Sequence, residues 1–414
     1  MTQSDQYIFK IFAEAVRTIV KYICTHQTSY DVLDFEPKID FASRRWWLIP
    51  VTRKSYYGEK LFEELKDHEA IKRSLELMLR EEFPRRLEIS EEKADYKLFL
   101  EVILPLAYEY IQEFGCDFIE QKFEKIFNEM MKYVEGWEVV AISPLENFEL
   151  EGAEEVTIDK YRIRKLNEWE MKQLIKRGYA DVLGETFGLS LGTIENLWCI
   201  EVTSRTTNIL DLSSDINEFL LIMRLFKNGN VLSSVTLGYP KTWKKTTYVI
   251  ALRKPVRTFL PRVKYVLKLN EIDSFRQLWN LYKHVKDKLP QELRIALKWF
   301  NKSYEEVEVE NRVLGLAIAF ETMFKSDRYD IQASKLVIDN PQEGKKVSEQ
   351  LEKLKTERNF IVHQGHSKLK PDKLEVIVTN SEDIFREYYK WFLEQIDKGR
   401  DYYEIINKLK HHKG

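Results

Sequence analysis

Arg358, Asn359 and His363 combine the residue types that phosphodiester chemistry uses. They occupy one and a half turns of a potential helix, and the three residues between Asn359 and His363 are apolar. A guanidinium stays positively charged and can bind two phosphate oxygens at once. An imidazole can accept or release a proton near neutral pH. These residues therefore have the chemistry to bind a phosphate and to move a proton beside it.

The segment 345–363 is expected to be a helix whose apolar stripe is interrupted by Arg358. The stripe has helical spacing and consists of Val347, Leu351, Leu354 and Ile361. A guanidinium in such a stripe needs a carboxylate or an anionic ligand, because burying an unpaired charge is costly. Glu321 interrupts the apolar segment 310–325 in the same way. We therefore predict an ion pair between Glu321 and Arg358; the alternative is that Glu321 reaches solvent at the edge of its helix.

His363 is expected at the end of the same helix, just before a C-cap at Gly365. It lies one turn after Asn359, so both side chains share a side of the helix. Arg358 lies about 140° around the axis from His363. Two copies of the helix, packed around a twofold axis, could bring both groups into one cleft. The alternative is that His363 only caps the helix.

Length and composition limit the number of domains, the fold class and the kinds of partner that can be expected. A chain of 414 residues is expected to form two or three domains. The many charged residues and few glycines and prolines favour helices. The net charge of -2 excludes a strongly basic nucleic-acid coat but not a local basic groove.

The sequence points to an intracellular protein that needs no metal or cofactor. Cys24, Cys116 and Cys199 are far apart and lack metal-ligand spacing, so we expect reduced core residues. The first residues do not read as a signal peptide, and no apolar run is long enough for a membrane span. No glycine-rich phosphate loop and no HExxH motif is present. We therefore expect a cytoplasmic location and no contact with a membrane.

We predict an α+β protein that is mainly α, with three regions. Residues 1–135 are expected to be helical, with the patch Arg44-Arg45-Trp46-Trp47 between helices either stacking on a nucleobase or belonging to the core. Residues 136–270 form a mixed α+β domain, a possible sensor, and residues 271–414 a helical bundle. Strands are expected at 137–142, 156–163, 197–203, 219–226 and 248–252.

Local signals add detail to this division. Asn228-Gly229-Asn230 is a hairpin turn signal, and Asn167 with Glu170 forms a capping box before a helix at 168–177. Pro290 and Pro341 mark helix boundaries. In the last region, helices are expected at 274–286, 291–301, 310–325, 345–363 and 382–396, with a short one after residue 401.

At the motif residues the chain resembles the HEPN superfamily and, within it, the Apea-like branch. The family signature is an arginine, a polar residue, a few apolar residues and a histidine, which Arg358, Asn359 and His363 match. Residues 362–365, Val-His-Gln-Gly, depart from the family's usual Val-His-Gly ending at Gln364.

The resemblance covers roughly residues 275–400. The segment 317–324 looks like the family's earlier acidic helix, and 294–300 fits the Apea-like layout. The segment 161–166 is similar to what often precedes this module. The resemblance implies a metal-independent endoribonuclease of four or five helices that works as a homodimer. Such proteins are common in toxin–antitoxin and antiphage systems, which implies an antitoxin or a phage-derived trigger as a further partner.

In the nuclease hypothesis, His363 moves a proton and Arg358 holds the scissile phosphate. Asn359 orients the phosphate or the imidazole, and Glu321 supports the site by pairing with Arg358. The lysines around the motif could guide RNA, and we single out Lys355, Lys368 and Lys370. The alternative for the lysines is an ordinary solvated helix face. The alternative for the whole region is a non-catalytic module for RNA binding or protein interaction. A third hypothesis makes the first two regions a sensor and the bundle its effector.

Overall fold

The computed structural model describes residues 3–26, 29–56, 58–81, 93–136, 138–187, 191–205, 209–240, 250–253, 263–336 and 340–411. Helix accounts for 64%, and sheets lie in the N-terminal part, so the predicted mainly α, α+β class is confirmed. Contacts divide the chain into two compact units. The N-terminal unit comprises Met1–Pro144, Asp159–Ser213 and Val235–Arg253, and the C-terminal unit comprises Leu145–Ile158, Ser214–Ser234 and Lys254–Gly414. Our three-region division stays a prediction.

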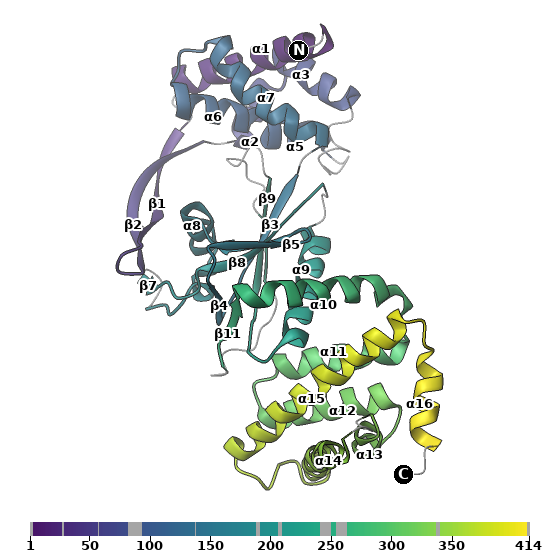
Figure 1. Ribbon diagram of the computed structural model, residues 1–414. Coiled ribbons are helices and arrows are strands. Elements are labelled where there is room, and N and C mark those ends of the chain that lie inside the picture. The colour runs from purple at the N-terminus through teal and green to yellow at the C-terminus, as the bar shows by residue number, and fades with distance from the viewer. Residues whose placement is uncertain are drawn as a thin grey trace. The chain divides into compact units, whose positions relative to one another are not determined.

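The N-terminal unit contains a helical core, as expected for much of residues 1–135. Its buried side chains include Phe12, Met78 and Phe127, which no solvent or almost none reaches. The helices lie side by side (Figure 1), and their buried apolar side chains form one cluster. They are α1 (Gln3–Thr25), α2 (Gly58–Leu65), α3 (Glu69–Arg80), α5 (Ala94–Leu98), α6 (Leu104–Phe114) and α7 (Glu120–Gly136), with a π-helical turn at Phe99–Ile103.

The expectation of three reduced cysteines is wrong for two of them. Cys24 at the end of α1 and Cys116 after α6 form a disulfide, and both residues are exposed. The two cysteines are 92 residues apart in sequence, so nothing local indicates the pairing. Cys199 is free and buried, and its burial raises the pKa of the thiol.

A long β-hairpin corrects the prediction that the first region is helical between residues 29 and 56. Strands β1 (Ser29–Asp40) and β2 (Arg45–Tyr56) pair antiparallel (Figure 1). Arg44 occupies the left-handed region at the turn, with φ 51°. Trp46 is buried in a core cluster, which bears out the core alternative for this residue. Trp47 lies partly exposed, with Lys38 Nζ 5.9 Å from its ring.

The central sheet of the N-terminal unit has the strand order β10-β9-β3-β8-β6. Helix α8 (Glu168–Lys176) buries Met171 and Leu174 in the same core as Val140 and Leu237 of the sheet. The strands are β3 (Val139–Pro144), β6 (Tyr161–Lys165), β8 (Trp198–Ser204), β9 (Val235–Pro240) and β10 (Ile250–Arg253); a short strand β7 (Leu191–Thr193) pairs instead with β2. The strands expected near 137–142, 197–203 and 248–252 are therefore present, although residues 137, 248 and 249 lie outside the described residues. The single strand expected at 156–163 is wrong in part, because a turn at Asp159 and Lys160 divides this segment into β5 (Glu155–Ile158) and β6.

A buried ionic cluster links α8 to this sheet. The Asn167 capping box is confirmed, because the Asn167 side chain accepts from Glu170 N at 2.9 Å and Glu170 accepts from Asn167 N. Arg164 donates to both oxygens of Glu170, at 2.6 and 2.9 Å, and to Glu201 at 2.6 Å. Tyr239 Oη also donates to Glu170. Burial by itself opposes ionisation of Glu170, but Arg164 and Tyr239 outweigh it and hold the pKa of this carboxyl below its ordinary value.

The C-terminal unit corrects two further predictions. Residues 219–226 are not a strand: they belong to helix α9 (Ile209–Phe226). Asn228-Gly229-Asn230 consequently follows a helix and does not join two hairpin strands. Gly229 has φ 127°, and a Cβ there would lie 2.8 Å from Tyr265 Cα, so this close approach requires glycine. The unit's strands are β4 (Phe148–Glu151), which pairs parallel with β11 (Tyr265–Lys268), and β5 (Glu155–Ile158).

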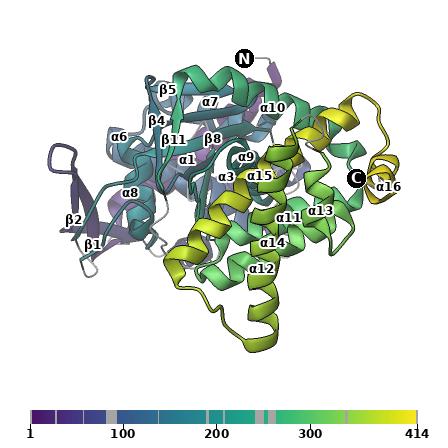
Figure 2. The same cartoon turned by 60° about the horizontal axis from the view of Figure 1, so that its bottom comes forward.

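The helical bundle of the C-terminal unit follows the expected helices closely. In it α11 packs on α12, and α12 packs on α14 and α15 (Figure 2). The helices are α10 (Ile272–Val285), α11 (Gln291–Glu305), α12 (Val309–Phe324), α13 (Tyr329–Ser334), α14 (Pro341–Gln364), α15 (Pro371–Asp397) and α16 (Tyr402–His411). Helix α13 was not predicted, and α15 begins eleven residues earlier than expected. Among the described helices, none is both long and apolar enough to cross a membrane.

We expect Glu170→Ala to lower the free energy of unfolding by about 3 kcal/mol, because it leaves the Arg164 charge in a largely buried site with one partner fewer. Urea unfolding followed by circular dichroism measures the change. Glu168→Ala is the matched control on the same helix, since its exposed pair with Lys172 should contribute at most about 0.5 kcal/mol. In the parent protein, this stabilisation should be lost as pH falls through the lowered pKa of Glu170. Equal effects of the two substitutions would contradict the role of the cluster.

Candidate active site

Helix α14 carries the three motif residues and has well-defined ends. It begins at Pro341, and the Asn340 side chain caps it by accepting from Glu343 N at 3.3 Å. It ends at Gly365, whose φ of 78° forms the predicted left-handed C-cap. Three residues of the predicted apolar stripe, Leu351, Leu354 and Ile361, are buried, whereas Val347 is only partly buried.

The predicted pair between Arg358 and Glu321 is present. Arg358 Nη2 lies 3.3 Å from Glu321 Oε1 on α12. Arg358 Nη1 also donates to Asn359 Oδ1 at 3.0 Å, so the neighbouring amide helps to orient the guanidinium. The side chains of Arg358 and Glu321 are 31% and 27% exposed. The guanidinium is therefore held in place and is still open to an anion from solvent.

Tyr329 lies beside this pair and was missed by the sequence analysis. Its ring is fully buried and stacks on Phe320 at 5.5 Å. Burial, together with the nearby charges of Glu321 and Asp330, raises the pKa of Tyr329, and Arg358 acts in the opposite direction. Within the residues that the structure describes, the Tyr329 hydroxyl has no hydrogen-bond partner. A neutral, unused donor therefore lies near the guanidinium.

His363 is exposed in the last turn of α14. In the described part of the chain, its imidazole makes no hydrogen bond and no ion pair. The ring is thus open to a ligand from solvent. On one helix it points to a different flank from Arg358, about 140° away. A single copy of α14 consequently does not place both groups on one phosphate.

The loop after α14 is tied back to the helix by a carboxylate that the sequence analysis also missed. Glu357 is buried, and Ser367 Oγ donates to its Oε2 at 2.5 Å. The same Ser367 Oγ accepts from Leu369 N at 2.9 Å. This loop carries Lys368, whose Nζ lies 4.2 Å from the centre of the Phe360 ring. The Phe360 ring, which lies between Asn359 and His363 in the sequence, therefore carries a cation from the loop that follows the helix.

The three lysines proposed to guide RNA differ in their surroundings. Lys355 Nζ lies 3.6 Å from Asp330 Oδ1, so much of its charge is already neutralised. Lys368 and Lys370 are exposed near the end of the motif helix. Lys345 pairs with Glu349 at 3.9 Å, as expected for a solvated helix face. Only Lys368 and Lys370 thus remain well placed to attract a phosphate backbone.

Buried charges position α12 against α15. Arg312 of α12 is 1% exposed, and its Nη2 donates to Glu382 of α15 at 3.2 Å. It also pairs with Glu375. Glu382 in turn faces Arg386 Nη2 at 3.6 Å. These pairs fix the register of α12 against α15 and thereby the place of Glu321.

Comparison with protein-family models, with curated proteins and with solved structures gives no match for this chain. Among the described residues, no group of histidine, cysteine, aspartate and glutamate side chains could hold a metal ion.

We expect the Arg358–Glu321 pair to contribute little to stability. A double-mutant cycle with Arg358→Ala and Glu321→Ala should give a coupling of about 0.5 kcal/mol, because both groups remain partly solvated. Arg312→Ala should instead cost about 3 kcal/mol, since it leaves the carboxylate of Glu382 buried with one cation fewer. Denaturant unfolding measures both. A coupling above about 2 kcal/mol would mean that Arg358 is a structural residue.

Proposed function

We propose that this chain is a metal-independent endoribonuclease of the HEPN type, of the Apea-like branch. The observation that carries the proposal is Arg358: a guanidinium oriented by Glu321 and Asn359 yet about a third exposed, on the helix that ends with a free, exposed imidazole at His363. A purely structural arginine would be expected to be more buried and more completely paired, as Arg312 is.

In the proposed reaction His363 takes the proton from the ribose 2′-hydroxyl or donates one to the leaving 5′-oxygen. The 2′-oxygen forms a bond to phosphorus while the bond from phosphorus to the 5′-oxygen breaks. The products are a 2′,3′-cyclic phosphate and a 5′-hydroxyl. Arg358 stabilises the charge that develops on the phosphate oxygens. The need for a 2′-hydroxyl makes the enzyme specific for RNA.

The proposed working form is a homodimer. Arg358 and His363 lie on different flanks of α14, so a cleft between two α14 helices supplies both groups to one phosphate. Val362, between the motif residues, is 54% exposed, which suits a helix that packs against a second copy. Lys368 and Lys370 would then guide the RNA towards the cleft.

A toxin or an antiphage effector is the biological role that we propose for such an enzyme, with an antitoxin or a phage-derived trigger as its regulator. The first two predicted regions are the proposed sensor. An RNA target favours the cytoplasm. Disulfides are rare in that reducing compartment, so the Cys24–Cys116 bond argues against this location.

The second candidate function is a non-catalytic module for RNA binding or protein interaction. Glu321 favours it, because a carboxylate 3.3 Å from Arg358 already neutralises part of the charge that a phosphate would need. In that case the Arg358–Glu321 pair is a structural contact at a dimer interface, and His363 only caps its helix. Degradation of RNA by the purified protein in the presence of a chelator discriminates between the two functions.

We expect His363→Ala and Arg358→Ala each to lower the rate of RNA cleavage in EDTA by about 100- to 10,000-fold, while circular dichroism shows an intact fold. Analysis of the RNA ends should find 2′,3′-cyclic phosphates. His366→Ala is the matched control: this exposed histidine is three residues from His363, its ring hydrogen-bonds among the described residues only to the Gln364 carbonyl oxygen, and the variant should keep the parent rate. Cleavage at the parent rate by either motif variant refutes the assignment.

A shared cleft predicts complementation between the two inactive variants. Arg358→Ala and His363→Ala proteins, unfolded together and refolded, should form mixed dimers in which one arginine and one histidine of different copies meet. Part of the activity should return, whereas each variant treated alone stays inactive. Light scattering should give twice the 49.5 kDa chain mass. A monomer, or a dimer without complementation, contradicts the composite site.

A further inference from the structure

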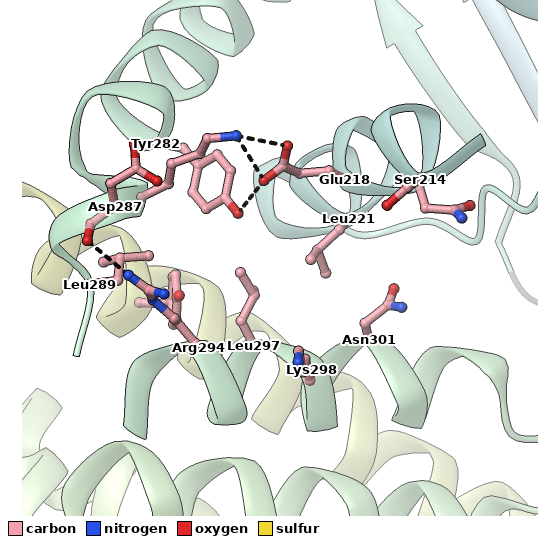
Figure 3. A pocket seen from close by; sticks show the side chains of 13 residues that line it. Ser214, Glu218, Leu221, Tyr282, Asp287, Leu289, Arg294, Leu297, Lys298 and Asn301 are labelled. Atoms are coloured by element: carbon pink, nitrogen blue, oxygen red, sulfur yellow. Dashed lines mark hydrogen bonds and ion pairs between the residues drawn. The ribbon is translucent and has the colours of Figure 1, made fainter. Parts of the chain in front are cut away.

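A cavity of about 450 Å³ lies within the C-terminal unit, away from the motif residues (Figure 3). Its walls come from α9, α10, α11 and the turn after α10, with Tyr389 of α15 added. Cavities of this volume commonly hold drug-sized organic ligands.

One end of the cavity is polar, and its charges are already paired. Glu218 of α9 accepts from Tyr282 Oη at 2.9 Å and lies 3.2 Å from Lys286 Nζ (Figure 3). Burial and the charge of Glu218 raise the pKa of Tyr282, which keeps its hydroxyl a donor. Asn301 is also engaged, because its Oδ1 accepts from the buried Arg224. These groups shape the cavity but leave little capacity for a charged ligand.

The middle of the cavity is apolar. Leu221 of α9 and Leu297 of α11 extend towards each other across it (Figure 3). Leu297 is 3% exposed, whereas Leu221 is only partly buried. Two leucines from opposite walls therefore form an apolar slot beside the polar end of the cavity.

The rest of the lining includes two exposed cations, Arg294 and Lys298, and the exposed carboxylate of Asp287. Arg294 and Lys298 are one helical turn apart on α11, so they lie on the same face. Arg294 Nη2 donates to the Asp287 carbonyl oxygen at 2.8 Å, which orients the guanidinium without neutralising it. Within the described residues, the side chains of Lys298, Ser214 and Asn217 make no hydrogen bond or ion pair.

We propose that this cavity binds a nucleotide-sized organic phosphate. Arg294 and Lys298 hold the phosphate, since two adjacent cations match its double negative charge. Ser214 and Asn217 face the polar, sugar-like part, and the base lies between Leu221 and Leu297. The inference does not depend on RNA cleavage, because it concerns other residues and another ligand.

Calorimetric titration of the full chain with the four nucleoside monophosphates, adenosine and inorganic phosphate tests the proposal. At least one monophosphate should bind with a Kd below about 100 μM, and adenosine should bind at least tenfold more weakly because it lacks the anion. Lys298→Ala should weaken binding about tenfold. Lys302→Ala is the matched control: Lys302 lies one turn further on α11, over the Trp299 ring, and does not line the cavity.

Leu221→Trp fills the slot and should abolish binding while circular dichroism and the unfolding midpoint stay close to those of the parent. The proposal is wrong if no monophosphate binds at 1 mM. It is also wrong if adenosine binds as well as its phosphate, or if both Lys298→Ala and Leu221→Trp bind like the parent. Because the measurement is binding and not cleavage, its failure leaves the nuclease proposal untouched.

Discussion

The carboxylate of Glu382 holds together the part of the molecule on which the candidate site depends. It is 2% exposed and lies between Arg312 of α12 and Arg386 of the same helix, α15. Buried ions without partners are strongly destabilising, so α12 cannot slide by one turn against α15 without a large loss of stability. This constraint fixes the face of α12 that presents Glu321, and through Glu321 the guanidinium of Arg358 on α14.

Arg312 of α12 and Arg358 of α14 differ in burial and in pairing, as a structural and a ligand-binding arginine would. Arg312 is enclosed and paired with two carboxylates, so its charge serves only the fold. Arg358 has one carboxylate and an amide, and about a third of its side chain meets solvent. The Tyr329 hydroxyl beside it is buried without a partner in the described part of the chain. A site that keeps unused donors next to an exposed cation gives up stability that a ligand can restore.

Sequence patterns predicted most of the bundle because its helices are amphipathic and have clear ends, such as the boundary at Pro341 and the C-cap at Gly365. They failed where the local signal is ambiguous. Residues 219–226 form a continuous apolar run, which a buried helix and a buried strand share, and they proved to be helical. The β1–β2 hairpin was missed because β1 is rich in charged residues and each strand contains a proline, Pro37 in β1 and Pro50 in β2.

The sequence by itself determined the identity and spacing of Arg358, Asn359 and His363, the helix that carries them, and Glu321 as the acidic residue that an arginine in an apolar stripe requires. It could do so because helical period and the cost of an unpaired charge act over a few residues. Only the tertiary structure decided how exposed Arg358 is and that Tyr329 lies beside the Arg358–Glu321 pair. It also decided that Cys24 forms a disulfide with Cys116 and that α9, α10 and α11 line a cavity. These features arise between elements far apart in the chain, where packing and not local spacing sets which groups meet.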